Sequence, residues 1–266
     1  MLISFMPLNE NQMPWMGGER WDMDGLVEPL YLYDSYLREC EAEVQSVEDG
    51  RYVVLDRTIF HPEGGGQPWD TGEIIRGGEE FKVLYVGIFS GRISHEVDRG
   101  GLEVGDSIRC RLDWNRRYKL MRMHTALHIL WAALVKLIEE LEILSSQIGL
   151  EHGRLDVRAD RAELIGKLSE IEETANRIVR EDRRVIARIL EREEAERLLL
   201  SYGENPSQLP SGERVRMVEV VDWDVAACLG THVRRTGEVG RIKILKRASK
   251  GRNIDRIYFT TLDNYT

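Results

Sequence analysis

Two pairs of histidine and cysteine residues, about a hundred positions apart, constrain the fold of this chain more than any other feature. The first pair is His124 and His128, and the second is Cys228 and His232. Each pair has the i, i+4 spacing that places two side chains on one face of a helix. Three imidazoles and one thiolate form a tetrahedral donor set that suits zinc. A single ion bound by all four residues requires a fold that brings the two distant segments together.

Either pair alone is a weak signal, because histidines at this spacing also occur in helices that bind no metal. Three of the six histidines and one of the three cysteines fall in the two pairs, which strengthens the case for one shared site. No ligand spacing surrounds the other histidines, His61, His95 and His152. Gly230 disfavours an ordinary helix between Cys228 and His232, so we expect a tight loop or a short helical turn there. The sequence leaves open whether the site is closed and structural or keeps an exchangeable position for catalysis.

The composition is that of a soluble globular protein with many charged residues. Hydrophobic residues make up 42% and charged residues 31% of the 266 positions, and no apolar run approaches the ~20 residues that a membrane span needs. The first residues lack the basic region of a signal peptide. The chain has only three cysteines, an odd number that argues against a disulfide framework. This indicates a reducing compartment. We therefore expect a cytoplasmic protein with no membrane partner.

The segment up to residue 112 has the short strands and frequent turns of a small β-barrel-like domain. Residues 1–29 have no clear period and are interpreted as an irregular lead-in. Glu43–Val47 and Tyr52–Leu55 predict a hairpin. The run Gly64, Gly65, Gly66 and Gln67 predicts a loop that another backbone or a ligand can approach closely. Further strands are expected at 30–33, 72–75, 81–87 and 92–97, with a short helical turn near 35–39.

After Asp113 the apolar period becomes helical, which predicts an α+β domain over residues 113–266. A helical stretch is expected from Trp114 to about Leu144, as one helix or two, and it carries the first ligand pair. Two further helices are expected at 161–186 and 191–200. Strands are expected within 147–157 and at 214–221, 241–245 and 254–261. The overall fold class is therefore α+β, with a domain boundary near residue 112.

Several separated blocks give the chain a specific resemblance. It is similar to the editing domain of alanyl-tRNA synthetase and, more closely, to the free-standing AlaX-type trans-editing proteins of medium length. The similarity extends over residues 30–261, and its blocks are Leu55–Phe60, Gly64–Pro68, Asp70–Gly72, His124–His128, Gly153–Asp156, Arg192–Ala195, Cys228–His232, Thr236–Gly240, Ile242–Leu245 and Ser249–Gly251. One departure is Leu229, which replaces the first glycine of the family's Cys-Gly-Gly-Thr-His pattern and alters the loop while keeping both ligands.

The resemblance implies a fold, a cofactor and a reaction. A small β-barrel-like domain would carry the glycine-rich motif, and an antiparallel-sheet and helix domain would hold Zn²⁺ through the four ligands. The activity implied is hydrolysis of tRNA(Ala) charged with the wrong amino acid, chiefly serine and also glycine. The rival interpretations are a zinc hydrolase of small esters or amides that does not use tRNA, and a non-catalytic RNA-binding or structural zinc protein. The sequence gives no oligomeric state.

The family pattern also indicates residues that contact the substrate. Thr125 and Gln147 are the candidate catalytic residues, although they also fit an ordinary helix threonine and a surface glutamine. Gly64, Gly65, Gly66 and Gln67 are the candidate substrate-binding residues, because exposed N–H groups of such a turn can hold a ribose or a phosphate. RNA also needs cations, and the candidates are Arg109, Arg111, Arg116, Arg117, Lys119, Lys243, Lys246, Arg247, Lys250 and Arg252.

Overall fold

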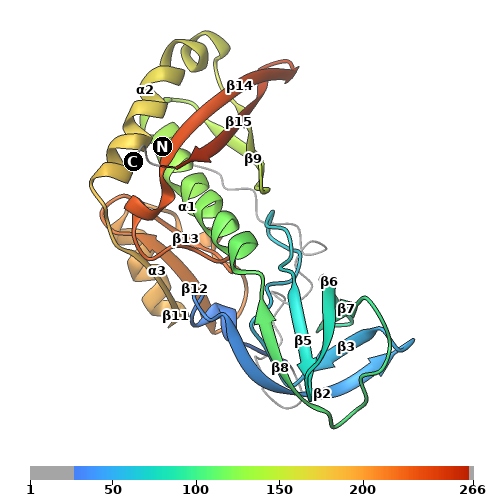
Figure 1. Ribbon diagram of the computed structural model, residues 1–266. Coiled ribbons are helices and arrows are strands. Elements are labelled where there is room, and N and C mark those ends of the chain that lie inside the picture. Colours follow the sequence, from blue (N-terminus) through green and yellow to red (C-terminus); the bar gives the residue numbers. More distant parts are fainter. Residues whose placement is uncertain (1–26, 264–266) are drawn as a thin grey trace.

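The computed structural model describes residues 27–263, and the lead-in predicted for 1–29 lies almost entirely outside this range. A closed barrel occupies one end of the molecule, and a long helix leads from it into a layered part of helices and sheets (Figure 1). The predicted α+β class is confirmed.

Six antiparallel strands form the barrel, in the order β2-β3-β7-β6-β5-β8. Their bounds are β2 Glu39–Glu48, β3 Tyr52–Leu55, β5 Gly72–Arg76, β6 Glu79–Phe89, β7 Arg92–Val97 and β8 Ser107–Leu112. The predicted hairpin is confirmed as β2 and β3. Short β1 (Glu28–Pro29) and β4 (Arg57–Thr58) form a parallel pair. The strand predicted at 30–33 is wrong: Leu30–Leu32 is a 3-10 helix, in which the N–H of Tyr33 donates to the carbonyl of Leu30 at 3.1 Å.

The barrel interior is apolar except for one buried hydrogen-bonded chain of polar groups. Its fully buried side chains include Val44, Leu55 and Phe81. His95 lies among them, with Nδ1–H donating to the carbonyl of Val53 at 2.9 Å and Nε2 accepting from the Thr58 hydroxyl at 2.8 Å. Burial lowers the pKa of His95 to about 4, because the interior disfavours the charged imidazolium. The ring is therefore neutral and fully hydrogen-bonded at neutral pH.

The long helix α1 (Trp114–Leu137) begins where Asp113 accepts a hydrogen bond from the N–H of Arg116 at 3.1 Å. It ends earlier than the predicted Leu144, because the segment after Ile138 becomes β9 (Glu142–Gln147). Two glutamates, at 139 and 140, follow the helix directly, where negative charge opposes the helix dipole. The pairing of β9 with β10 (Gly153–Arg158) then decides the conformation, and it confirms the expected strand pair in this region with shifted bounds.

A four-stranded antiparallel sheet, in the order β14-β15-β10-β9, packs with α1 around the larger hydrophobic core. Strands β14 (Arg241–Gly251) and β15 (Ile254–Leu262) form a long hairpin, and β14 continues six residues past the predicted end at Leu245. Helix α2 (Arg161–Arg180) covers β14, where the side chain of Asn176 accepts from the N–H of Ile242 at 2.9 Å and donates to its carbonyl at 2.8 Å.

A three-stranded antiparallel sheet completes the layered part. Its strands are β11 (Val185–Glu191), β12 (Arg214–Val220) and β13 (Asp224–Ala227), and α3 (Arg192–Ser201) packs against it. The predicted helix over 161–186 is therefore too long, because Val185 and Ile186 pair with β12 instead. The predicted helix at 191–200 and strand at 214–221 are confirmed. Short 3-10 helices occur at Pro206–Gln208 and Thr236–Val239.

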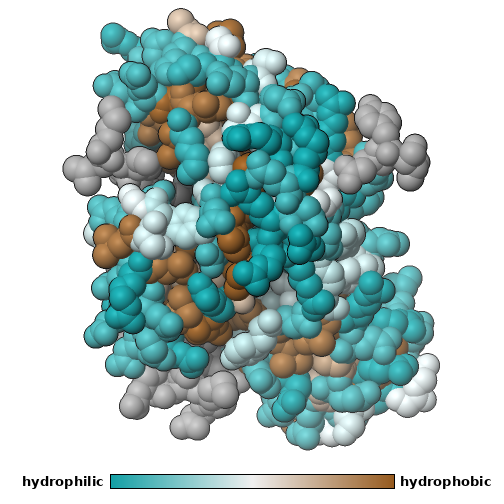
Figure 2. All heavy atoms as spheres, turned by 90° about the vertical axis from the view of Figure 1, so that its left-hand side faces the viewer, coloured by the Kyte–Doolittle hydropathy of each residue, from teal (hydrophilic) through white to brown (hydrophobic). Residues whose placement is uncertain are grey.

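The face that carries α2 and α3 is mainly hydrophilic, with hydrophobic atoms in separate patches rather than one continuous surface (Figure 2). Mixed ion pairs on α2, such as Lys167 with Glu163 at 2.7 Å and Arg180 with Glu173 at 2.5 Å, fit a solvated face.

A fully buried ion pair joins the barrel to α1. Asp70 follows the glycine-rich run, and Arg117 lies in the first turns of the helix; both side chains are completely buried. The Arg117 Nε–H donates to both carboxylate oxygens of Asp70, at 3.0 and 3.1 Å. The guanidinium also donates to the carbonyls of Ser35 and Ile59, at 2.9 and 2.6 Å. This pair fixes where α1 starts relative to the glycine-rich loop.

Candidate metal centre

The fold brings all four predicted ligands to one point. His124 and His128 lie one turn apart on α1, and Cys228 and His232 lie on the loop that follows β13. Their ligand atoms all lie within 4.8 Å of one another, and we call these four residues the ligand cluster. Cys228 Sγ is 3.3 Å from Nε2 of His232 and 3.6 Å from Nε2 of His124. The cluster is half-buried to buried and could hold a metal ion.

His124 is oriented by Gln67, which lies on the loop between β4 and β5. Its Nδ1–H donates to Oε1 of Gln67 at 2.7 Å. The Gln67 amide is held in turn by Thr231, whose N–H donates to the same oxygen at 3.1 Å and whose hydroxyl accepts from Nε2 of Gln67 at 2.9 Å. The proton on Nδ1 leaves the lone pair of His124 on Nε2, which faces Cys228.

The other two imidazoles are oriented in the same way. Nδ1–H of His128 donates to Oδ2 of Asp224 at 2.8 Å. Nδ1–H of His232 donates to Oγ1 of Thr125 at 3.1 Å, and this hydroxyl also accepts from the N–H of Val233 at 3.3 Å. In each ring Nδ1 is engaged, so Nε2 is the nitrogen left for a metal, as in metal-ligating histidines.

The electrostatics of the cluster favour a thiolate. Burial raises the pKa of Cys228, but the imidazoles of His124 and His232 lower it more strongly, so that the pKa lies well below its ordinary value. Burial lowers the pKa of His128, but hydrogen bonds with Asp224 and Cys228 outweigh burial and raise the pKa to about 10. A metal that binds here must therefore displace a proton from this imidazole.

The loop between Cys228 and His232 is shaped by a glycine and a buried arginine. A Cβ on Gly230 would lie 2.1 Å from Cε1 of His124 and 2.7 Å from Oε1 of Gln67, so only glycine fits. Arg216 on β12 donates from Nη1 to the carbonyls of Cys228 and Gly230, at 2.6 and 3.0 Å. The expectation of a tight loop rather than an ordinary helix is confirmed, since no helix spans these residues.

The glycine-rich run forms a tight turn beside the ligand cluster, and we call residues Gly64–Gln67 the glycine turn. The N–H of Gly64 donates to the carbonyl of Gln67 at 3.1 Å, and the reverse bond measures 2.9 Å. Gly65 and Gly66 have φ values of 58° and 79°, which fits a turn of type I′. A Cβ on Gly66 would lie 2.8 Å from the carbonyl oxygen of Ser146, on β9. The turn therefore packs directly against the sheet and places Gln67 over the ligands.

The two candidate catalytic residues lie in different environments. Thr125 is fully buried on α1 and contacts His232. Gln147 is exposed at the end of β9, next to the glycine turn, and its Oε1 accepts from Nε of Arg154 at 3.0 Å. The side chain of Gln67, predicted to bind substrate, is buried and engaged by the ligand cluster and its loop. The geometry does not test whether Thr125, Gln147 or Gln67 contacts the substrate, so each of these contacts stays a prediction.

Three residues that support the site were not predicted to do so from the sequence. Asp224 orients His128, Arg216 holds the ligand loop, and Gln67 contacts a ligand rather than only a substrate. Asp224 precedes Cys228 by the same four positions that separate the ligands, and this spacing could have drawn attention to it. No sequence pattern indicated the role of Arg216, because an isolated arginine in an apolar strand does not show where its guanidinium points.

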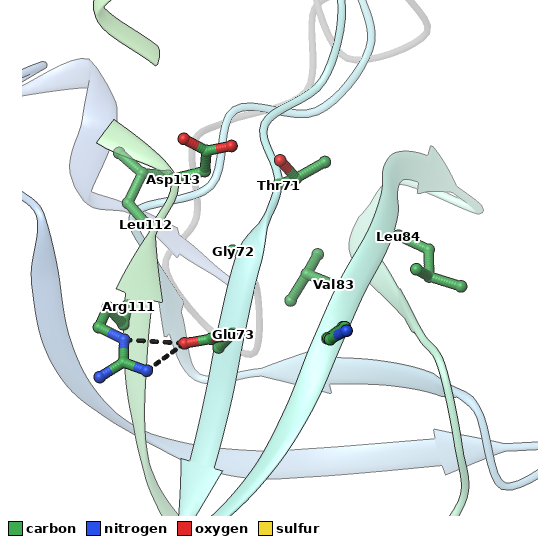
Figure 3. A pocket seen from close by; sticks show the side chains of 9 residues that line it. Thr71, Gly72, Glu73, Val83, Leu84, Arg111, Leu112 and Asp113 are labelled. Carbon is green, nitrogen blue, oxygen red and sulfur yellow. Dashed lines mark hydrogen bonds and ion pairs between the residues drawn. The ribbon is translucent and has the colours of Figure 1, made fainter. Parts of the chain in front are cut away.

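The structure shows that some of the predicted RNA-binding cations are buried or paired with carboxylates. Arg117 is wrong as an RNA contact, because it is fully buried against Asp70. Arg111 pairs with Glu73 through Nε at 2.8 Å and with Glu80 at 2.9 Å, so its charge is neutralised. It lines a hollow of about 470 Å³ on the barrel, between β5, β6 and β8, in which the Arg111–Glu73 pair is visible (Figure 3). This hollow shares no residue with the ligand cluster.

Comparisons with known proteins agree with the resemblance. Residues 215–258 match the family described as the threonyl and alanyl tRNA synthetase second additional domain, and residues 32–116 match the class II (A) tRNA synthetases. The alanyl-tRNA editing proteins AlaX-M of Methanosarcina acetivorans and Methanosarcina mazei are 43% and 41% identical; each alignment covers 90% of this chain and 100% and 98% of the relative. The alanine–tRNA ligase of Pyrococcus abyssi is 42% identical over 86% of this chain, which corresponds to 25% of the ligase.

The barrel, the ligand cluster and these matches define a protein of the class formed by the editing parts of alanyl-tRNA synthetases and their free-standing relatives. Within this class, the chain belongs to the AlaX-M family of alanyl-tRNA editing proteins. Within residues 27–263, none of the helices combines the length and the apolar composition that a membrane span requires.

Proposed function

We propose that this protein is a free-standing deacylase that hydrolyses the ester of tRNA(Ala) charged with the wrong amino acid, chiefly serine and also glycine. The observation that carries this proposal is the ligand cluster beside the glycine turn, in a chain similar over 90% of its length to alanyl-tRNA editing proteins. The names of these relatives support editing of alanyl-tRNA, and the choice of serine and glycine rests on the family resemblance.

We infer that the metal is Zn²⁺, held by His124, His128, Cys228 and His232. The donor set fits, because three Nε2 atoms and one cysteine sulfur converge while Gln67, Asp224 and Thr125 occupy the three Nδ1 atoms. A bound zinc supplies a Lewis acid that polarises a carbonyl and acidifies a bound water. If all four residues bind at once, the ion has a structural role and shapes the pocket. If one position stays exchangeable, the ion can take part in catalysis.

The residues of the chain itself would position the aminoacyl ester. The glycine turn would form one wall of the pocket, with the N–H groups of Gly65 and Gly66 directed at the ribose or the terminal phosphate, since those of Gly64 and Gln67 bond within the turn. Gln147 is exposed beside this turn and would contact the substrate directly. Thr125 is buried against His232, so we propose that it acts on catalysis by holding this imidazole.

Discrimination between serine and alanine would depend on the serine hydroxyl. A pocket that hydrogen-bonds this hydroxyl leaves its own polar groups unpaired when alanine binds, and an unpaired buried group costs roughly 1–3 kcal/mol. The correct product, alanyl-tRNA(Ala), is therefore spared because its side chain cannot satisfy the pocket.

A deacylation assay with purified protein tests the proposal. We expect release of serine from seryl-tRNA(Ala), and of glycine from glycyl-tRNA(Ala), with little release of alanine from alanyl-tRNA(Ala). Cys228→Ser should lose this activity, whereas Cys40→Ser, which alters a half-buried thiol of the barrel, should keep it. Cleavage of a free amino-acid ester without cleavage of either mischarged tRNA would instead support the small-ester hydrolase. Metal content without any esterase activity would support a structural or RNA-binding zinc protein.

A further inference from the structure

The four-stranded sheet turns one face to the core and the other, its outer face, away from it. On β15 the residues Ile257 and Phe259 are buried, while the alternating Arg256 and Tyr258 are half-exposed. Strand β10 shows the same alternation, with Leu155 and Val157 buried and the polar residues at 154, 156 and 158 on the outer side. Polar side chains from neighbouring strands therefore gather on the outer face.

One row of residues crosses all four strands on this outer face. Gln147 of β9 is opposite Arg154 of β10, Arg154 is opposite Tyr258 of β15, and Tyr258 is opposite Lys246 of β14. Nε–H of Arg154 donates to Oε1 of Gln147 at 3.0 Å. Lys246 Nζ lies 4.7 Å from the centre of the Tyr258 ring. The row therefore presents a tyrosine between two cations.

The charge on the outer face is predominantly positive. The hydrogen bond from Arg256 is the largest cause that lowers the pKa of Tyr258, and the charges of Lys246 and Lys250 lower it further. Asp156 pairs with Arg256 at 2.6 and 2.7 Å and with Arg154 at 3.4 Å, so two arginines share one carboxylate. Within residues 27–263, neither Lys246 nor Lys250 has a carboxylate within 4.0 Å. Two lysines therefore add uncompensated charge to a protein whose net charge is −9.

The neighbouring cations in the sequence differ from these two lysines, because they are held in ion pairs. Lys243, on the same strand, pairs with Glu172 of α2 at 2.9 Å, and Arg247 pairs with the buried Asp255. The basic run near the C-terminus thus divides into residues that hold the fold together and residues that face outward. Arg154 lies far from this run in sequence, and the sheet pairing brings it into the outward group.

The row ends next to the candidate metal centre. A Cβ on Gly66 would lie 3.4 Å from Cα of Gln147, and the N–H of Ile148 donates to the carbonyl of Gly66 at 2.8 Å. The residue after Gly66 is Gln67, which contacts His124. A polyanion lying along the row would therefore have its end directed to the glycine turn and the ligands.

We propose that the row Gln147–Arg154–Tyr258–Lys246, together with Lys250, binds the sugar-phosphate backbone of tRNA close to its 3′ end. Lysine and arginine side chains contact phosphates and so position an RNA, and the tyrosine ring offers a surface on which an unpaired base stacks. The inference rests on the proposed function, since it takes the tRNA of the deacylation reaction as the partner.

Binding of uncharged tRNA(Ala), measured by fluorescence anisotropy over a range of KCl concentrations, tests this assignment. The double variant Lys246→Ala/Lys250→Ala should bind about tenfold more weakly, and the slope of log K against log salt should fall by about 1.4 to 1.8 for two lost phosphate contacts. Tyr258→Ala should weaken binding at least about fivefold, whereas Tyr258→Phe, which keeps the ring, should bind like the wild type.

Lys243→Ala is the matched control, because it removes the same charge from the same strand but from a lysine that is paired with Glu172. It should bind tRNA(Ala) with wild-type affinity and salt slope. Metal content provides a readout of folding for every variant, since the substituted side chains are not metal ligands. Wild-type affinity of both the double variant and Tyr258→Ala would overturn the assignment, even if the wild-type protein deacylates seryl-tRNA(Ala). Weakened binding by these variants would support it, even if the wild-type protein deacylates nothing.

Discussion

Oε1 of Gln67 lies 2.7 Å from Nδ1 of His124, so a residue of the loop that leads into barrel strand β5 directly orients a residue of the candidate metal centre. The two residues are 57 positions apart in the chain. The glycine turn brings them together, because it packs on β9 and places Gln67 over α1. The glycine-rich motif therefore contributes to the ligand geometry as well as to the predicted wall of the pocket.

Gln67→Ala should weaken metal binding by about 10–100-fold, since removal of a group that orients a metal ligand typically has this effect. Competition with a chromophoric chelator measures the affinity. Gln147→Ala is the control, because this exposed glutamine contacts Arg154 rather than a ligand. Equal metal affinity of Gln67→Ala and the wild type would show that Gln67 does not orient His124.

Asp224→Ala should weaken metal binding to a similar degree, about 10–100-fold, because His128 loses the carboxylate that fixes its tautomer. Asp224→Asn should lose less, as an amide oxygen can still accept from Nδ1–H. The same chelator competition applies, with Asp222→Asn as a nearby exposed control. The idea fails if Asp224→Ala binds metal as tightly as the wild type.

Arg117→Met should lower the free energy of unfolding by roughly 3–5 kcal/mol, because Asp70 is then a buried charge without a partner. Urea unfolding measures this loss. Arg116→Met is the matched control, as the adjacent Arg116 is only partly buried. The double variant Arg117→Met/Asp70→Leu should lose less than the sum of the two single variants, and strict additivity would argue against a coupled pair.

The stability of the barrel should depend on pH through His95. The pKa is about 4 in the folded barrel and about 6.5 when the residue is solvated. Above about pH 6.5 both states are neutral and the full stability is present. Between pH 6.5 and 4 the unfolded chain binds a proton that the folded barrel excludes, so the free energy of unfolding falls as the pH falls, by up to about 3 kcal/mol.

His95→Gln removes this titration and isolates its effect. The difference in free energy of unfolding between wild type and variant should narrow as the pH is lowered from about 7.5 to about 4.5, because only the wild type loses the His95 contribution. A difference that stays constant over this range would show that His95 does not titrate as a buried neutral group.

Much of the architecture could be predicted from the sequence, because hydrophobic periodicity reports local structure. The alternation and turn signals up to residue 112 predicted β2, β3, β5, β6 and β7 but not β8, and the helical period after Asp113 predicted α1. The errors lie where pairing with distant strands decides the conformation. Residues 142–144 lie within the predicted helix, yet they belong to β9 and pair with β10, and Val185 and Ile186 pair with β12.

The sequence predicted the four residues that form the ligand cluster but not the residues that support them. The i, i+4 spacing within each pair indicated the four residues of the ligand cluster without any knowledge of the fold. The roles of Asp224, Arg216 and Gln67 depend on the directions of side chains from three separate elements, and spacing carries no such information. For the same reason, nothing in the sequence around Arg117 distinguished a buried partner of Asp70 from an RNA-binding cation.

One metal ion, held by the two ligand pairs, is the feature on which hydrolysis of mischarged tRNA(Ala) depends in the proposed function. Stripping the metal with a chelator, and following deacylation of seryl-tRNA(Ala) as Zn²⁺ is added back, measures this dependence. We expect activity to be lost on stripping, to return with added zinc and to saturate at about one ion per chain, with alanyl-tRNA(Ala) spared throughout. Full deacylation of seryl-tRNA(Ala) by the stripped protein would show that the metal is not needed for the reaction.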